Sequence, residues 1–155
     1  MSGSQLGGEG GYVGAMEQRE ARERFLRARA GVLGTGGSDD GPHLVPIVFV
    51  VEGDVIAFAV DHKPKRTKDL RRLRNIARDD RVCVLVDHYE EDWTRLWWVR
   101  ADGRAGVVED AGVQEEWIGR LVERYEQYRE QRPEGPVVAI SVERWRGWSY
   151  QALDE

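Results

Sequence analysis

The chain has a single cysteine and no long apolar run. Cys83 is its only cysteine among 155 residues, so no intramolecular disulfide can form. No apolar stretch reaches the roughly 18 residues that a membrane-spanning helix needs. The first residues lack the basic segment and following apolar segment of a secretory signal peptide. We therefore expect a cytoplasmic protein with no membrane segment, in which Cys83 is a buried small apolar residue within Val82–Val86.

The usual sequence signatures of catalysis and metal binding are also missing. The three histidines, His43, His62 and His88, do not have metal-ligand spacing, and one cysteine cannot build a structural zinc site. There is no nucleophile elbow, no Walker loop and no glycine fingerprint of dinucleotide binding after a strand. No metal site is predicted, and no residue is assigned a catalytic role. An enzyme of this kind would depend on a cofactor for its chemistry.

The length of the chain suits one domain. A domain of this size buries about 68–70% of its unfolded surface, so its core needs neither a disulfide nor a metal. Residues 1–14 are rich in glycine and serine and are predicted to be a flexible N-terminal tail. We predict that residues 15–155 form a single cofactor-binding domain.

Apolar residues recur with helical spacing in three segments. These predicted helices are Ala15–Arg29, Thr67–Arg78 and Val113–Arg129, and the first is interpreted as a docked cap. Their expected buried faces are Ala21, Phe25, Ala28 and Val32 in the first, Leu70, Leu73, Ile76 and Ala77 in the second, and Val113, Trp117, Leu121, Tyr125 and Tyr128 in the third.

Strand-like segments outnumber the helices and are joined by short turns. The predicted strands are Val32–Thr35, His43–Val51, Val55–Val60, Val82–Tyr89, part of Thr94–Glu109, and Val137–Tyr150. The second and third are apolar at nearly every position, which predicts that both of their faces are covered, as in a closed barrel or a buried interface. The order of elements favours a mainly β fold, an antiparallel barrel with helices outside it.

The charge distribution is uneven. The chain has a net charge of −5, yet residues 61–81 hold nine basic and four acidic side chains, which leaves −10 for the rest. The basic side chains are Lys63, Lys65, Arg66, Lys68, Arg71, Arg72, Arg74, Arg78 and Arg81. Binding of RNA usually requires a basic domain with aromatic stacking platforms, and the acidic balance fails the first condition. We therefore predict a local anion site and no nucleic-acid partner.

The position of this basic segment favours a phosphate. It begins where a buried strand ends, Pro64 stiffens it, and it enters a helix that Thr67 can cap. A helix N-terminus offers free N–H groups and the positive end of the dipole. Lys65, Arg66 and Arg72 are predicted to bind the anion. The remaining helical cations, Lys68, Arg71, Arg74 and Arg78, are interpreted as a solvated face.

Several segments resemble one known family. His43–Phe49 and Ala59–Arg66 resemble the opening strands of PPOX-class F420-dependent oxidoreductases. Leu70–Ile76 followed by Asp80–Val82 is similar to their helix-to-strand segment, and Asp87–Tyr89 with Trp93–Ala105 resembles an actinobacterial-type branch. The resemblance covers about Ala21 to Tyr150. Gly31–Gly37 departs from it, because it is richer in glycine than the usual opening strand.

The resemblance implies a homodimeric, FMN-binding-like split β-barrel whose cofactor grooves lie at the dimer interface. It implies F420 as cofactor and hydride transfer to an unknown small-molecule acceptor. By position, the anionic part of the cofactor falls to Lys63, Lys65, Arg66, Thr67 and Arg72, and its ring to Pro46, Ile47 and Val48. Relatives bind FMN, F420 or heme on this barrel. The alternatives are therefore an FMN-dependent enzyme of the pyridoxamine-phosphate oxidase type and a non-catalytic cofactor or heme carrier.

Overall fold

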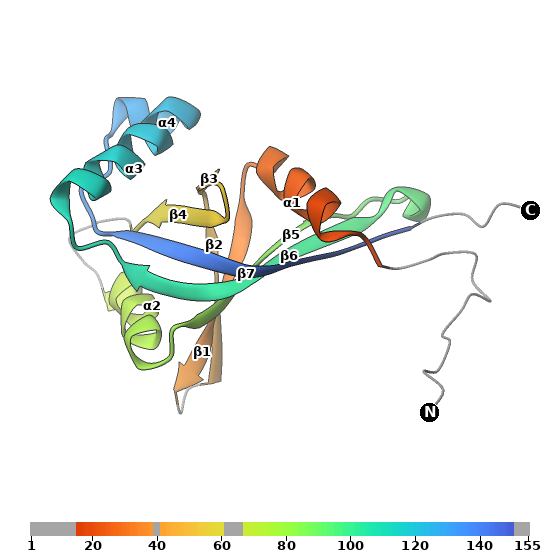
Figure 1. Cartoon of the computed structure of the whole chain (residues 1–155), viewed down its shortest axis with the longest axis horizontal. Coiled ribbons are helices and arrows are strands. Elements are labelled where there is room, and N and C mark those ends of the chain that lie inside the picture. The colour runs from red at the N-terminus through yellow and green to blue at the C-terminus, as the bar shows by residue number, and fades with distance from the viewer. Residues whose placement is uncertain (1–14, 39–40, 61–66, 151–155) are drawn as a thin grey trace, which may run out of the picture.

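A computed structural model describes residues 15–38, 41–60 and 67–150 (Figure 1). Its strands are β1 (Gly31–Ser38), β2 (Gly41–Ile47), β3 (Val50–Glu52), β4 (Val55–Ala59), β5 (Arg81–His88), β6 (Trp97–Val107) and β7 (Val137–Ser149). Its helices are α1 (Gln18–Arg27), α2 (Thr67–Arg78), α3 (Ala111–Arg124) and α4 (Glu126–Glu130), with a 3₁₀ turn at Trp93–Arg95. Within these described ranges, no helix has the length and apolar character to span a membrane.

The strands form one sheet of seven in the order β2-β1-β5-β6-β7-β4-β3, and every pairing is antiparallel. This confirms the predicted mainly β, antiparallel fold. In Figure 1, β6 and β7 run along the length of the molecule, with α1, α3 and α4 on one side and α2 on the other. The strands β2 and β3 lie at opposite ends of the sheet although only Val48 and Phe49 separate them in sequence. The sheet must therefore curl on itself, as a split barrel does.

The predicted strand His43–Val51 is accordingly wrong as a single element. The chain leaves β2 at one edge of the sheet and joins β3 at the other. The prediction that both faces are covered, by the barrel or by an interface, is not tested for the outer face of β2, where exposure alternates and Leu44 of this single chain is 70% exposed. It is confirmed for β4, in which Ile56 to Ala59 are all buried.

The large core cluster is formed by residues of the sheet together with residues of α1 and of α2. The side chains of Phe25, Phe49 and Phe58 are fully buried in it. The ring of Phe25 lies 4.8 Å from that of Phe49 and 5.3 Å from that of Trp145. Removing a side chain of this size from water contributes about 1.5–3 kcal/mol. This packing confirms the interpretation of the first helix as a docked cap, although α1 begins later than predicted, at Gln18.

Some predicted helix faces are wrong in detail. Ala28 caps α1 in an extended conformation and Val32 lies on β1, so neither belongs to the helical face. Ala77 of α2 is exposed, whereas Ile76 is buried as predicted. The apolar spacing alone is compatible with Ala28 and Val32 on a helix. In the structure the chain must already be extended at Gly31, because β1 pairs with β2 and β5.

The third predicted helix is divided in two. Tyr125 is extended, with φ −116° and ψ 120°, and separates α3 from α4. On α3 the buried side chains are Ile118 and Leu121, whereas Val113 is 42% exposed. The hydroxyl of Tyr125 is hydrogen-bonded to the backbone of Phe49, and this tertiary contact accompanies the break. A smaller core cluster forms beneath α3, where Ile118, Leu121 and Tyr125 contact β3, β4 and β7.

Candidate anion and cofactor site

The structure describes part of the predicted anion site. Lys63, Lys65 and Arg66 lie outside the described residues. Thr67 is the first residue of α2, and Arg72 is only 9% exposed. Arg72 therefore lies further inside the fold than the edge of the apolar stripe, where its sequence position puts it. Arg74 and Arg78 are exposed as predicted.

The three residues predicted to lie along the cofactor ring follow one another at the end of β2. Pro46 is exposed, Ile47 is 6% exposed, and Val48 is partly buried just beyond the strand. Pro46 and Ile47 pair with Val32 and Gly31 of β1. They form an apolar stretch of backbone without side-chain charges. Such a stretch is suited to lie along a planar ring.

A buried polar contact joins α2 to the sheet. The side-chain amide of Asn75 donates a hydrogen bond of 3.1 Å to the hydroxyl of Thr35 on β1, and each residue is 4% exposed. Buried polar groups without a partner are costly, so this bond selects one rotation of α2. Arg71 and Arg72 lie four and three residues before Asn75, which places them on the side of α2 that faces the sheet.

His43 faces the same cluster from β2. It is the register partner of Thr35, so the two side chains project from the same face of the sheet. Its Nδ1 atom is shielded from solvent and has no hydrogen-bond partner within the described part of the chain. Burial, followed by the positive charges of Arg71 and Arg72, lowers the pKa of His43 below 6.5. The imidazole is therefore mainly neutral at pH 7.

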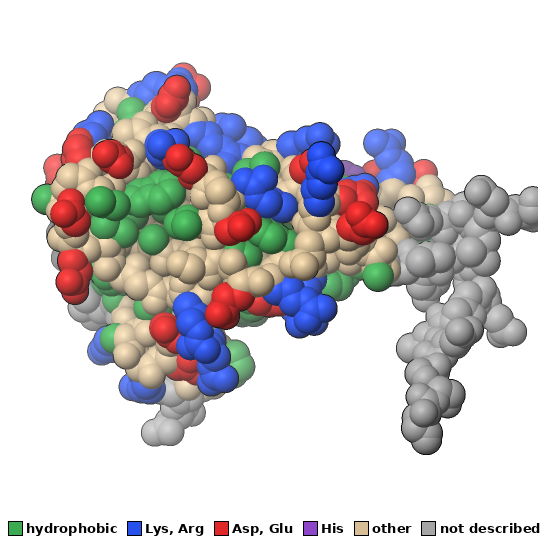
Figure 2. Space-filling model, viewed as in Figure 1, with side chains coloured by type: hydrophobic (Ala, Val, Ile, Leu, Met, Phe, Trp, Pro, Cys, Tyr) green, Lys and Arg blue, Asp and Glu red, His purple; other side chains and the backbone are tan. Residues whose placement is uncertain are grey.

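Positive charge is concentrated on α2. Its twelve residues include five basic side chains and one acidic side chain. Figure 2 shows basic side chains over α2 and the neighbouring strands, with acidic ones among them. The carboxylates after the helix are already paired: Asp79 accepts from Arg81 at 2.8 Å, and Asp80 pairs with Arg104 at 2.8 Å. Hydrogen bonds from Arg81 lower the pKa of Asp79 to about 2.

These residues fit an anionic cofactor. Arginine side chains, a helix start and a shielded histidine nitrogen that finds no partner among the described residues are groups that recognise phosphate or carboxylate oxygens. The apolar end of β2 belongs to the same strand as His43. The site thus combines an anion-binding part and a ring-binding part. The sequence did not identify His43 as a site residue. Exposure alternates along β2 in the structure, but the apolar residues that follow His43 do not alternate with polar ones in the sequence.

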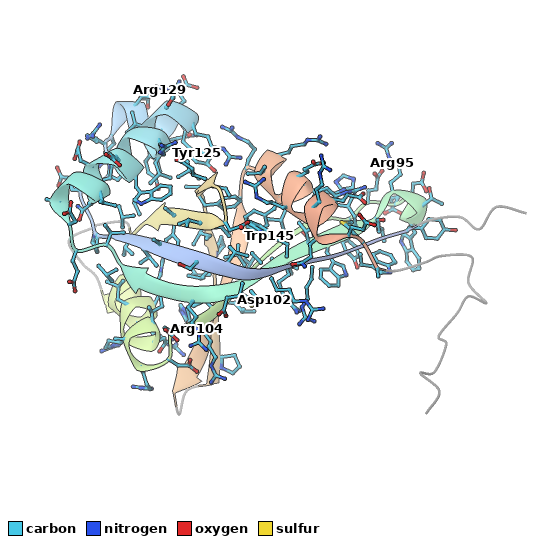
Figure 3. All side chains as sticks on the ribbon, viewed as in Figure 1. Arg95, Asp102, Arg104, Tyr125, Arg129 and Trp145 are labelled. Carbon is cyan, nitrogen blue, oxygen red and sulfur yellow. The ribbon has the colours of Figure 1, made fainter. Side chains whose placement is uncertain are left out.

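A second cavity of about 450 Å³ lies at the far end of the β5–β6 hairpin, where Arg95 is found (Figure 3). His88 stacks on Trp97 with their ring centroids 6.2 Å apart, and the guanidinium of Arg24 lies 5.3 Å from the same indole. Glu90 pairs with His88 at 2.7 Å and with Arg95 at 3.2 Å. Sequence reasoning did not identify this cavity, although the hairpin register makes His88 and Trp97 direct partners.

The outer face of the sheet carries a shallow apolar groove of about 450 Å³. Its lining includes Gly34, Leu44 and Cys83. Gly34 is the register partner of both others, and a Cβ atom there would lie 3.2 Å from the sulfur of Cys83. Cys83 is partly buried, so the prediction of a buried cysteine holds only in part, and burial raises the pKa of its thiol. Leu85, 36% exposed, extends the apolar surface.

Comparison with protein families gives one match. The model described as "Pyridoxamine 5'-phosphate oxidase" matches residues 18–149. No curated protein sequence matches the chain.

Solved structures with the same fold are numerous. A FAD-binding protein from Mesorhizobium loti is 17% identical with a TM-score of 0.69, over 91% of this chain and 99% of that one. A conserved hypothetical protein from Mycobacterium tuberculosis is 23% identical with a TM-score of 0.70, over 93% and 90%. The heme storage protein HutZ from Vibrio cholerae is 16% identical with a TM-score of 0.66, over 88% and 98%. At these identities the likeness shows a shared fold.

Proposed function

Because the chain belongs to the pyridoxamine 5'-phosphate oxidase family, we propose that it is an F420-dependent oxidoreductase that transfers a hydride between this deazaflavin and a small organic acceptor. The observation that carries the proposal is the concentration of basic residues from Lys63 to Arg81 in an acidic chain. FMN has a single phosphate, whereas F420 carries a phosphate and a tail of glutamates. The local excess of basic side chains, nine against four acidic ones, matches the longer anion better.

In this proposal the chain binds and orients the cofactor. Lys63, Lys65 and Arg66 contact its anionic part together with the start of α2 at Thr67, and Arg72 adds a charge from inside the fold. Pro46, Ile47 and Val48 lie along the ring and keep water from that side. The bound cofactor supplies the hydride chemistry.

The proposal includes a homodimer formed through the outer face of the sheet. Leu44 and Leu85 are exposed there beside the apolar groove, and exposed apolar surface of this kind often marks a protein contact. Asp102 beside the groove is already paired, since it accepts from Arg100 at 2.8 Å and lies 3.1 Å from Arg146. Sedimentation of the wild type and of Leu44→Lys tests it. We expect a dimeric wild type and a monomeric Leu44→Lys variant, because the lysine places a charge in the interface. A monomeric wild type would overturn the proposed dimer.

Titration of the purified protein with F420, followed by fluorescence quenching, tests the cofactor. We expect binding in the micromolar range or tighter, and no binding at micromolar concentrations would refute the proposal. Arg72→Gln is expected to weaken binding by about tenfold or more, since charge-assisted hydrogen bonds contribute about 1.5–3 kcal/mol. Arg78→Gln, at the exposed end of the same helix, is the matched control and should bind as the wild type does. Thermal unfolding of both variants separates a loss of binding from a loss of folding.

An FMN-dependent enzyme is the second candidate. The Mesorhizobium loti structure is named as a FAD-binding protein, which favours a flavin over F420. A yellow preparation that releases FMN would support this reading against F420. A non-catalytic carrier, as the name of the Vibrio cholerae protein suggests, predicts tight cofactor or heme binding. It also predicts that reduced F420 is never oxidised across a broad panel of acceptors.

A further inference from the structure

A polar cluster lies between α2 and the β1–β2 hairpin. Asn75 is bonded to Thr35, and His43 stands directly opposite Thr35 on the same face of the sheet. Arg71 and Arg72 lie one helical turn nearer to the start of α2. The cluster thus joins the end of the hairpin to the helix start at which the proposed cofactor phosphate binds.

Among the described residues, the charged groups that act on His43 are positive. The charged groups that act on His43 from α2 are Arg71 and Arg72, and β1 contributes the hydroxyl of Thr35. The nearby carboxylate at the end of α2, Asp79, is held by Arg81 through hydrogen bonds of 3.0 and 2.8 Å. A half-buried cluster with two cations and a shielded nitrogen acceptor or donor is a favourable place for an anion.

We propose that His43 is a pH-sensitive ligand of the cofactor's anionic part, which it binds together with Arg71 and Arg72 while taking up a proton. This inference rests on the proposed function for the identity of the anion. It also gives Arg71 a binding role, in place of the solvated role that its sequence position suggested. The half-buried state of Arg71 agrees with this role.

The proton uptake follows from the electrostatics of the cluster. Without an anion, burial and the two arginines keep the pKa of His43 below 6.5, so it is mainly neutral at pH 7. A bound anion offsets the arginine charges and raises the pKa of His43, because it stabilises the imidazolium. The raised pKa belongs to the bound state, so affinity increases as pH falls through it and levels off below the pKa of the free state. Each unit of difference between the two pKa values gives about a tenfold change in affinity.

Titrations of F420 across a pH series test the inference. The wild type is expected to bind about tenfold more tightly, or more, at the acidic end of the series than at the alkaline end. His43→Gln keeps a hydrogen-bonding side chain but cannot titrate, so its profile should show only the cofactor's own titration. His88→Gln removes a histidine from the distant hairpin and should keep the wild-type profile. Identical profiles for the wild type and His43→Gln would overturn the inference.

Calorimetry in two buffers with different ionisation enthalpies measures the protons taken up. Uptake is expected for the wild type and His88→Gln, and its loss is expected for His43→Gln. The same calorimetry with FMN and with riboflavin, which lacks the phosphate, shows which anionic group of the ligand causes the proton uptake. Uptake with FMN and none with riboflavin assigns it to phosphate, and uptake with F420 alone assigns it to the glutamate carboxylates.

A measurement without cofactor separates this inference from the proposed function. NMR titration of the His43 ring in phosphate and in chloride buffers measures whether a bound phosphate changes the pKa of His43. An increase in the pKa of His43 in phosphate supports the anion site even if F420 fails to bind, in which case only the proposed function is lost. Binding of F420 together with an unchanged His43 pKa, in phosphate and in the complex, would refute the inference and leave the function standing.

Discussion

Replacing Tyr125 with phenylalanine tests how the fold holds the end of β2. The hydroxyl of Tyr125 accepts a hydrogen bond of 3.1 Å from the backbone N–H of Phe49 and donates one of 2.7 Å to its carbonyl. Tyr125 is 6% exposed and Phe49 is fully buried. Phe49 follows Val48, the last residue proposed to lie along the cofactor ring. The contact therefore holds the backbone at the edge of the proposed site.

The magnitude follows from what remains after the hydroxyl is removed. The carbonyl of Phe49 keeps a partner, since Arg124 donates to it at 3.0 Å. The N–H of Phe49 loses its acceptor in a buried position, which costs about 1–3 kcal/mol. We expect Tyr125→Phe to lower the free energy of unfolding by that amount. For a protein of this size the melting temperature should fall by about 2–4 °C for each kcal/mol.

Chemical unfolding followed by tryptophan fluorescence measures the change, and amide hydrogen exchange at Phe49 locates it. Exchange at this amide should become faster, because its hydrogen bond is lost. Tyr89→Phe is the control, since Tyr89 is 66% exposed and its hydroxyl can bond to water. The reasoning is refuted if Tyr125→Phe stays within about 0.5 kcal/mol of the wild type and exchange at Phe49 is unchanged.

Two further predictions concern the sheet and α2. A Cβ atom at Gly103 would overlap the carbonyl oxygen of Ser141, so Gly103→Ala should destabilise the protein by about 1–3 kcal/mol in urea unfolding. Gly106→Ala on the same strand meets nothing within 4 Å, and equal effects would contradict the packing argument. The pKa of Asp79 is lowered from 3.8 to about 2 by Arg81, so its stabilising contribution is present above 3.8 and lost as pH falls toward 2. The stability difference between wild type and Asp79→Asn should shrink over that range, and a difference independent of pH would argue against the pairing.

The sequence by itself determined the class of fold and most of its elements. Helix α2 was predicted at its observed bounds, Thr67–Arg78, because apolar spacing is a local signal. The strands β4, β5 and β7 were predicted to within one residue at each end. The reversal of charge around α2 was also visible in the sequence, since charge depends on composition alone.

Only the tertiary structure decided where the chain bends and which side chains meet. The break between β2 and β3 lies within one continuous apolar run, and it arises because the two strands join opposite edges of the sheet. The end of α3 coincides with a bond between Tyr125 and Phe49, 76 residues apart. His43 lies within the electrostatic reach of Arg71 and Arg72 because α2 packs against β1, the partner strand of β2. Such contacts depend on long-range pairing, which local sequence patterns do not contain.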